Sequence, residues 1–186
     1  MNNNILLVID VQKGFARKPN TYDKALKISE LVEGKYFDIS VATKFVNAQN
    51  SPYEKFMKWE RLRETEEISI FNEKMEFIYN KILEKNTYTS VNDELLETLK
   101  NLNNNQLPTE VFICGIDTDC CVLTTAVNLF EVGIRPIVLT QYCASNGGES
   151  SHQAALTCMG RLIGSHHLVS NEIDSKSDIE LIKNNL

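Results

Sequence analysis

Short, largely apolar runs recur along this chain of 186 residues, and they restrict the fold more than any other feature of the sequence. The clearest run covers residues 5–9 and contains no polar residue. Such a run is typical of a strand that is buried on both faces, as in a parallel sheet. By the same pattern we predict strands at 5–9, 39–43, 77–83, 111–115, 134–140 and 168–169.

Helical spacing of apolar residues separates these runs. It predicts helices at 22–33, 91–99, 121–132, 149–163 and 179–182. The first has a start signal at 19–21 and a stop at Gly34, and Asn92 opens the second. The expected apolar side of the fourth helix consists of Ala154, Ala155, Met159 and Leu162.

Alternating strands and helices favour an α/β fold in which a parallel sheet lies between two helical layers, joined by right-handed crossovers. No linker rich in Pro, Gly or Ser and no internal repeat interrupts the chain, so we expect one domain over residues 1–186. Chains of this length bury roughly 70% of their unfolded surface, which is enough for a full core.

Charge and cysteine content exclude several classes of protein. A net charge of −6 argues against a nucleic-acid partner, and glutamates interrupt the basic run at 55–63. No stretch reaches the ~20 apolar residues of a membrane helix, and the start of the chain does not resemble a secretory signal. Five cysteines, two of them adjacent, fit reduced thiols in the cytoplasm better than disulfides. No metal-ligand spacing is present, and we expect no cofactor.

Residues 44–78 are the least regular part of the sequence, with aromatic side chains among polar ones. Long insertions of this kind often cover a site. We expect Phe15, Trp59 and Tyr88 to contact a substrate, whereas Phe56 and Phe71 are interpreted first as core residues.

In open parallel sheets, ligands bind beyond the carboxyl ends of the strands. Asp10 follows the first strand, Lys85 the third, and the stretch from Gly115 to Cys121 the fourth. Gln141–Ser145 follow the fifth. Asp10 either caps a turn or pairs with a nearby lysine, or it accepts a proton in catalysis. Lys85 is either a solvated surface charge or, near Asp10, holds a carboxylate in place or stabilises developing negative charge.

Cys121 is the strongest candidate for a nucleophile, because it lies where a polar turn meets the start of a helix. The free N–H groups there favour a thiolate, as would a nearby lysine. The alternative is a buried structural cysteine, which suits Cys114, Cys143 and Cys158 better. Spacing alone does not choose between Cys121 and Cys120. No G-x-S-x-G elbow is present, and no histidine is placed to act as a base.

The candidate residues also carry a resemblance to a known family. The string L-V-I-D-V-Q at 7–12 with Phe15, then Lys85, then C-G-I-D-T-D-C-C-V-L-T-T-A at 114–126 resemble the isochorismatase-like cysteine hydrolases. Cys143-Ala144-Ser145 and His152 add to the match, which runs from residue 5 to about 165. Nicotinamidases and N-carbamoylsarcosine amidases belong to this family.

The resemblance implies Cys121 rather than Cys120 as nucleophile, with Asp10 and Lys85 completing the catalytic set. It implies a six-stranded parallel sheet, a homodimer or homotetramer, and a small-molecule substrate. It also implies a cis bond between Ile116 and Asp117, which would direct the N–H groups of Asp117 and Cys121 toward a substrate carbonyl.

The sequence departs from the family in three places. Nicotinamidases carry a metal-binding D-x-H pair after the second strand, where this chain has T-K-F-V-N at 43–47, so a nicotinamidase metal site is not expected. Position 117 is often Ala in relatives, and Asp117 would add a carboxylate near the pocket or point away. Gln141 stands where the family often has an acid.

Three functions remain to be compared. The complete catalytic set favours a cysteine hydrolase acting on a C–N bond of a small amide or carbamoyl compound. The alternative is a non-catalytic, oligomeric small-molecule-binding member of the same fold. A nucleotide-binding protein is the least supported, because no glycine-rich phosphate motif follows the first strand.

Overall fold

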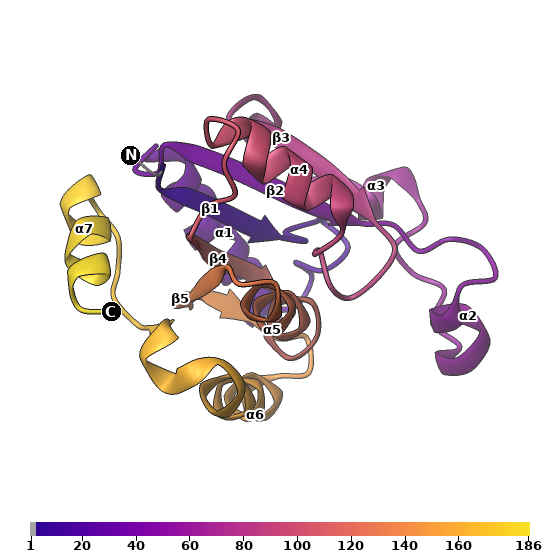
Figure 1. The fold of residues 1–186 in the computed structure, drawn as a ribbon. Helices are drawn as coiled ribbons and strands as arrows, with labels where there is room; N and C mark the ends of the chain where they lie inside the picture. Colours follow the sequence, from indigo (N-terminus) through magenta and orange to yellow (C-terminus); the bar gives the residue numbers. More distant parts are fainter. Residues whose placement is uncertain (1–2) are drawn as a thin grey trace.

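A six-stranded sheet forms the centre of the molecule in the computed structural model, which describes residues 3–186 (Figure 1). Its strands lie in the order β3-β2-β1-β4-β5-β6, and every neighbouring pair is parallel. The strands are β1 (Ile5–Ile9), β2 (Ile39–Phe45), β3 (Lys81–Lys85), β4 (Glu110–Ile116), β5 (Arg135–Ala144) and β6 (Leu168–Val169). The predicted α/β fold with a parallel sheet is confirmed.

Helices cover both faces of this sheet, with α4 and α5 in front of it in Figure 1 and α1 behind. One π turn precedes α5 and another follows α6, and 3-10 turns precede β3 and β6. The α-helices are α1 (Pro19–Glu33), α2 (Pro52–Met57), α3 (Thr65–Ile68), α4 (Asp93–Leu102), α5 (Leu123–Glu131), α6 (Glu149–Met159) and α7 (Lys176–Asn184). The π turns are Thr118–Val122 and Gly160–Gly164, and the 3-10 turns are Glu73–Phe77 and Ser165–His167. No helix within residues 3–186 is long and apolar enough to cross a membrane.

The central strands β1 and β4 are buried over nearly their whole length, which explains their uninterrupted apolar sequence. Each fully buried aliphatic side chain contributes about 1.5–3 kcal/mol relative to an exposed one. Gly115 lies where the two strands approach closely. It has φ 141°, and a Cβ atom there would lie 2.2 Å from the Ile9 carbonyl oxygen. Only glycine therefore fits at this point of the sheet.

The third strand was predicted wrongly at 77–83. The strand is Lys81–Lys85, and Phe77 ends a 3-10 turn with its side chain exposed. The reason is that β3 is an edge strand with partly exposed faces, so its sequence lacks the apolar run of a central strand. Lys85 is consequently the last residue of the strand rather than a residue beyond it.

Element ends also differ from the predictions. Helix α1 begins at Pro19, because a proline fits the first turn of a helix, and no side chain caps it. Asn92 does cap α4, accepting a hydrogen bond from the Leu95 backbone N–H. β5 continues to Ala144 after a register shift, so Gln141 lies exposed within the strand and not beyond its end.

Four side chains interpreted as buried are exposed. Phe56 is 82% exposed on the short helix α2, which turns Tyr53 rather than Phe56 toward the protein. Cys158 and Ala154 are exposed on α6, which buries Ala155 and Met159, and Leu162 is exposed in the turn that follows this helix. Phe71 is partly buried against the core, and its ring meets that of Tyr22 edge-on at 5.1 Å.

Candidate active site

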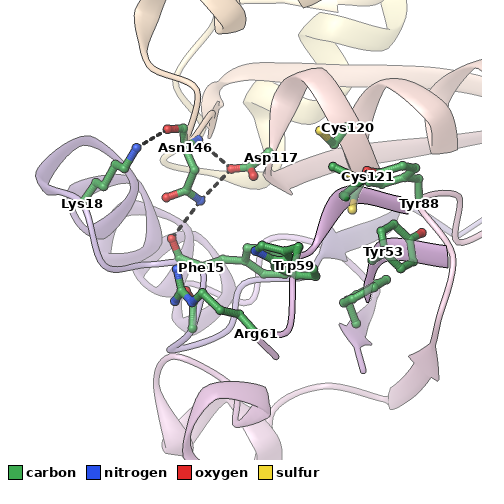
Figure 2. Close-up of a pocket in the computed structure, with 13 residues that line it drawn as sticks. Phe15, Lys18, Tyr53, Trp59, Arg61, Tyr88, Asp117, Cys120, Cys121 and Asn146 are labelled. Atoms are coloured by element: carbon green, nitrogen blue, oxygen red, sulfur yellow. Dashed lines mark hydrogen bonds between the residues drawn. The ribbon is translucent and has the colours of Figure 1, made fainter. Parts of the chain in front are cut away.

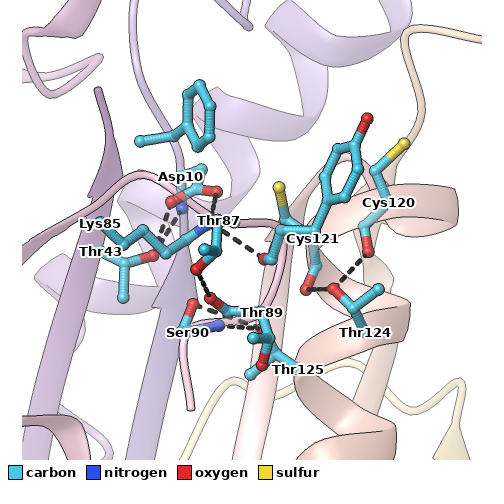
Figure 3. A network of polar contacts seen from close by, with 12 residues as sticks. Asp10, Thr43, Lys85, Thr87, Thr89, Ser90, Cys120, Cys121, Thr124 and Thr125 are labelled. Carbon is cyan, nitrogen blue, oxygen red and sulfur yellow. Dashed lines mark hydrogen bonds and ion pairs between the residues drawn. The ribbon is translucent and has the colours of Figure 1, made fainter. Parts of the chain in front are cut away.

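Asp10 lies directly after β1 and has no solvent exposure. Its backbone has φ 51°, in the left-handed region that few residues other than glycine adopt. Thr43, at the neighbouring position on β2, donates a hydrogen bond of 2.7 Å from Oγ1 to Asp10 Oδ1. The other oxygen, Oδ2, lies 2.7 Å from Lys85 Nζ (Figure 3). The strained turn thus holds a buried carboxylate in one orientation.

Lys85 ends β3 and is almost completely buried. Besides Asp10, its ammonium group contacts the carbonyl oxygens of Thr87 at 2.8 Å and Tyr88 at 3.0 Å. Burial would lower the pKa of Lys85, but the charge of Asp10 and the sulfur of Cys121 outweigh it, and the pKa is raised. Lys85 is therefore a fixed positive charge across the neutral pH range.

Cys121 lies in the π turn that leads into α5, with its side chain buried. Its sulfur lies next to both the Asp10 carboxylate and the Lys85 ammonium group, close enough for each to shift its pKa. Burial and the Asp10 carboxylate raise the pKa of Cys121 well above its ordinary value, and Lys85 offsets this only in part. Burial and Asp10 thus oppose the thiolate that the helix start was expected to favour, whereas Lys85 acts in the expected direction.

Geometry also separates the two adjacent cysteines. Cys120 is half-buried and lines the same pocket, but its pKa is raised to about 11 by burial and by Asp119 and Asp117. Of the two, Cys121 is the one whose pKa is shifted by Asp10 and Lys85. The structure thus brings the three predicted catalytic side chains together, from the ends of β1 and β3 and the start of α5.

Two polar side chains, Gln12 and Thr125, hold these elements in place through contacts that the sequence did not indicate. Gln12 is fully buried and donates from Nε2 to the carbonyls of Phe45 at 3.0 Å and Ile68 at 2.9 Å. The Ser90 backbone N–H donates to Thr125 Oγ1 at 3.0 Å, which joins the loop after Lys85 to α5. Gln12 and Thr125 both belong to the recognised motifs, but nothing in their spacing reveals these partners.

A cavity of about 260 Å³ opens onto Cys121 (Figure 2). Aromatic rings form most of its apolar wall, and the rings of Phe15 and Trp59 stack with centroids 6.3 Å apart. Tyr88 lines it as well, so all three predicted contact residues reach the cavity. The sequence did not point to the other lining residues: Gly14, Lys18, Phe45, Tyr53, Met57, Arg61 and Asn146.

Much of this wall comes from the connection between β2 and β3, residues 46–80. Buried Asn47 organises it by donating from Nδ2 to the carbonyls of Trp59 and Arg61, both at 3.0 Å. Arg61 in turn donates to the Gly14 carbonyl at 2.7 Å and pairs with Glu67. The irregular predicted insertion thus lies beside the cavity, as expected, but through contacts that no periodicity could signal.

Asp117 points toward the cavity rather than away from it. Its Oδ1 accepts two hydrogen bonds from Asn146, from the backbone N–H at 2.7 Å and from Nδ2 at 2.8 Å. Burial raises its pKa to about 6, against the hydrogen bonds from Asn146, which lower it. The peptide bond between Ile116 and Asp117 is cis.

The residues present do not fit the metal site of nicotinamidases. Thr43 hydrogen-bonds Asp10, and the other positions after it carry no carboxylate or imidazole. Nowhere in residues 3–186 do three His, Cys, Asp or Glu side chains gather as metal ligands would. The Nδ1 atom of His152 contacts Thr118 Oγ1 at 2.8 Å, and this histidine does not line the cavity.

Comparisons with known proteins agree with this architecture. The structure is similar to nicotinamidase PncA from Bacillus subtilis, with 22% identity, a TM-score of 0.72, and coverage of 87% of this chain and 97% of that chain. An isochorismatase-like hydrolase from Alkaliphilus metalliredigens gives 20% identity, a TM-score of 0.69, and coverage of 86% and 91%. Pyrazinamidase of Pyrococcus horikoshii, solved in complex with zinc, gives 21%, 0.69, and coverage of 86% and 96%.

At such identities the similarity shows the fold alone. No curated protein matches the sequence. Residues 4–165, however, match the model of the family described as the isochorismatase domain. Because this match covers well over half of the chain, the protein belongs to the isochorismatase family, as the motifs around Asp10, Lys85 and Cys121 predicted.

Proposed function

We propose that the protein is a cysteine hydrolase that cleaves a C–N bond of a small amide or carbamoyl compound through a thioester at Cys121. One observation carries the proposal: the Asp10–Lys85 ion pair lies next to Cys121, and Cys121 lines a cavity with an apolar wall. A buried carboxylate next to a buried thiol is suited to proton transfer on attack.

In the proposed first half-reaction, Asp10 accepts the thiol proton while the Cys121 sulfur forms a bond to the substrate carbonyl carbon. Backbone N–H groups of Asp117 and Cys121 would stabilise the oxyanion, and Lys85 would offset the charge that moves between sulfur and carboxylate. Collapse breaks the C–N bond, and the proton held by Asp10 passes to the departing nitrogen. An amine or ammonia leaves, and a thioester remains.

In the second half-reaction, Asp10 accepts a proton from water as the oxygen attacks the thioester carbon. The C–S bond breaks, Cys121 regains the proton, and a carboxylic or carbamic acid is released. Every proton released in the two half-reactions is taken up again, and no electron passes to or from a redox partner. Nicotinamidases are among the similar structures, yet the metal ligands those enzymes carry are replaced here, so nicotinamide itself is not the favoured substrate.

Ammonia release from a panel of small amides tests the proposal, with nicotinamide, pyrazinamide, benzamide and N-carbamoylsarcosine as probes. Activity should disappear in Cys121→Ala and persist in Cys158→Ala, a matched control because Cys158 is exposed on α6. Equal activity in Cys121→Ala would refute the nucleophile. A wild-type protein that binds amides without releasing any product would instead support the non-catalytic alternative.

We further propose that the protein works in the cytoplasm as a homodimer or homotetramer. All five cysteines are free, which suits a reducing compartment, and the family resemblance suggests an oligomer. Light scattering coupled to size-exclusion chromatography measures the assembly directly, and a single monomeric species would contradict it.

A further inference from the structure

Within residues 3–186, hydrogen bonds reach only one of the two oxygens of the Asp117 carboxylate. Both hydrogen bonds from Asn146 reach Oδ1. Among the contacts of residues 3–186 none reaches Oδ2, although the side chain lines the cavity (Figure 2). Asp117 is half-buried at the cavity wall, and a ligand in the cavity that supplies an N–H group would give this oxygen a donor.

Two cationic side chains at the same cavity, those of Lys18 and Arg61, would repel a positively charged ligand that Asp117 attracts. Lys18 is exposed and donates to the Asn146 carbonyl, and Arg61 is paired with Glu67. The Arg61 side chain is 44% exposed, so solvent and ions screen its charge strongly. Asp117 is better shielded, and its attraction for a bound group is correspondingly less screened.

The neighbouring rings fit a flat ligand that carries a positive charge. Phe15 and Trp59 stack at an interplanar angle of 17°, and Tyr53 and Tyr88 meet edge-on with centroids 5.0 Å apart. Aromatic faces attract cations as well as flat apolar groups, Trp most strongly. The aromatic wall therefore favours a planar ligand, and the Asp117 carboxylate determines where the hydrogen-bond donor of that ligand would lie.

We propose that Asp117, held by Asn146, determines specificity by accepting a hydrogen bond from an N–H or ammonium group on the substrate, so that the protein prefers small, flat amides that carry a basic nitrogen. The choice of amides as ligands depends on the function proposed above. The selection by Asp117 concerns binding and is testable without turnover.

Dissociation constants measured on the Cys121→Ala variant test this directly. The probes are benzamide, its aminomethyl derivative and its carboxylate derivative, the last two as 3- and 4-substituted isomers. One aminomethyl isomer should bind roughly 10- to 100-fold more tightly than benzamide, as expected for a charge-assisted hydrogen bond. In the Asp117→Asn, Cys121→Ala double variant this preference should fall to about one.

Tighter binding of the carboxylate probe, or an unchanged preference in the double variant, would overturn the proposal. The first result would assign the selection to Lys18 and Arg61. Because binding is measured without the nucleophile, the outcome is independent of catalysis: a protein that releases no ammonia but shows this preference refutes the proposed function and leaves the role of Asp117 standing.

A pH series on Cys121→Ala gives a second result that needs no change at position 117. As the pH falls through about 6, Asp117 takes up a proton and loses its charge, so the preference for the aminomethyl probe over benzamide should decrease. The ratio of the two dissociation constants cancels the effect of any group that changes the binding of both probes equally. The other titratable groups that line the cavity or lie close to Asp117 in this variant are Asp10, Lys18, Tyr53, Arg61, Tyr88, Asp119, Cys120 and His152. A preference that is constant from about pH 5 to about pH 8 contradicts the proposal.

Discussion

The residues proposed for chemistry and the residues proposed for recognition are held in place by different means. Asp10 and Lys85 lie at the ends of strands of the central sheet, where backbone ladders fix their positions, and Cys121 lies in the turn between β4 and α5. All three are almost completely buried. The cavity wall from the β2–β3 connection, residues 46–80, has no ladder of its own beyond one isolated bridge. It is positioned by side-chain hydrogen bonds from Asn47 and Gln12. Changes in the first region should therefore affect rate or global stability, and changes in the second should affect affinity.

Asp10→Asn should give the largest effect and tests the chemical half of this comparison. Asparagine keeps the shape and can still accept from Thr43, but it is a far weaker proton acceptor. Loss of a general base should lower kcat by about 10²- to 10⁴-fold while benzamide binding changes little. Steady-state kinetics and binding measured in parallel decide the point. A change confined to KM would contradict the assignment.

Lys85→Met removes the one charged side chain that pairs with the buried Asp10 carboxylate among residues 3–186. Leaving one member of a buried ion pair alone should cost about 3–5 kcal/mol in the free energy of unfolding. Lys44→Met is the matched control, because Lys44 on the adjacent strand pairs with the exposed Glu84 at 3.0 Å and should cost less than about 1 kcal/mol. Urea unfolding measures both. Equal losses would mean that the pair is not buried in solution.

Asn47→Ala tests the recognition half. It removes the donors to Trp59 and Arg61 and the acceptor of Ser51, with an expected cost of about 1–3 kcal/mol that is concentrated in residues 46–80. Hydrogen exchange should rise in that connection, and KM should rise more than kcat falls. Asn92→Ala, which loses a helix cap at about 1 kcal/mol, is the control that should leave KM unchanged.

Asp117→Asn should give the smallest effect on stability, and its sign depends on pH. The folded protein raises the pKa of Asp117 from 3.8 to about 6, so folding favours the protonated form. Wild type should therefore lose stability relative to the variant as the pH rises from about 4 to about 6, by about 1–2 kcal/mol in total. Thermal or urea unfolding of both proteins across this range measures the difference. A difference that does not change with pH would show that the carboxylate is well solvated.

Sequence reasoning predicted the sheet far better than the connection. Central strands such as β1 are predictable because burial on both faces demands an apolar run, and a polar residue that ends such a run lies at the ligand-binding edge. The edge strand β3 was predicted wrongly because its partly exposed residues do not form an apolar run. Family motifs supplied the choice of Cys121 and the importance of Lys85, which position alone left open.

The connection shows what a pattern cannot supply. Asn47 and Arg61 look like ordinary polar residues, because their roles come from single hydrogen bonds to distant backbone carbonyls. Phe56 looks like a core residue, yet it belongs to a helix of six residues that buries only Tyr53. Likewise, the sequence placed Asp117 near the pocket but left its direction open, since that depends on its contact with Asn146.

Gly115 has a consequence that reaches beyond the packing of two strands. The carbonyl that excludes a side chain at Gly115 belongs to Ile9, whose next residue along the chain is the proposed proton acceptor. The separation of β1 from β4 and the position of the Asp10 carboxylate are therefore set by the same backbone atoms. A single added methyl group at Gly115, far from any substrate, would displace the base by moving the strand on which it stands, so the interior of the sheet sets the accuracy of the proposed chemistry.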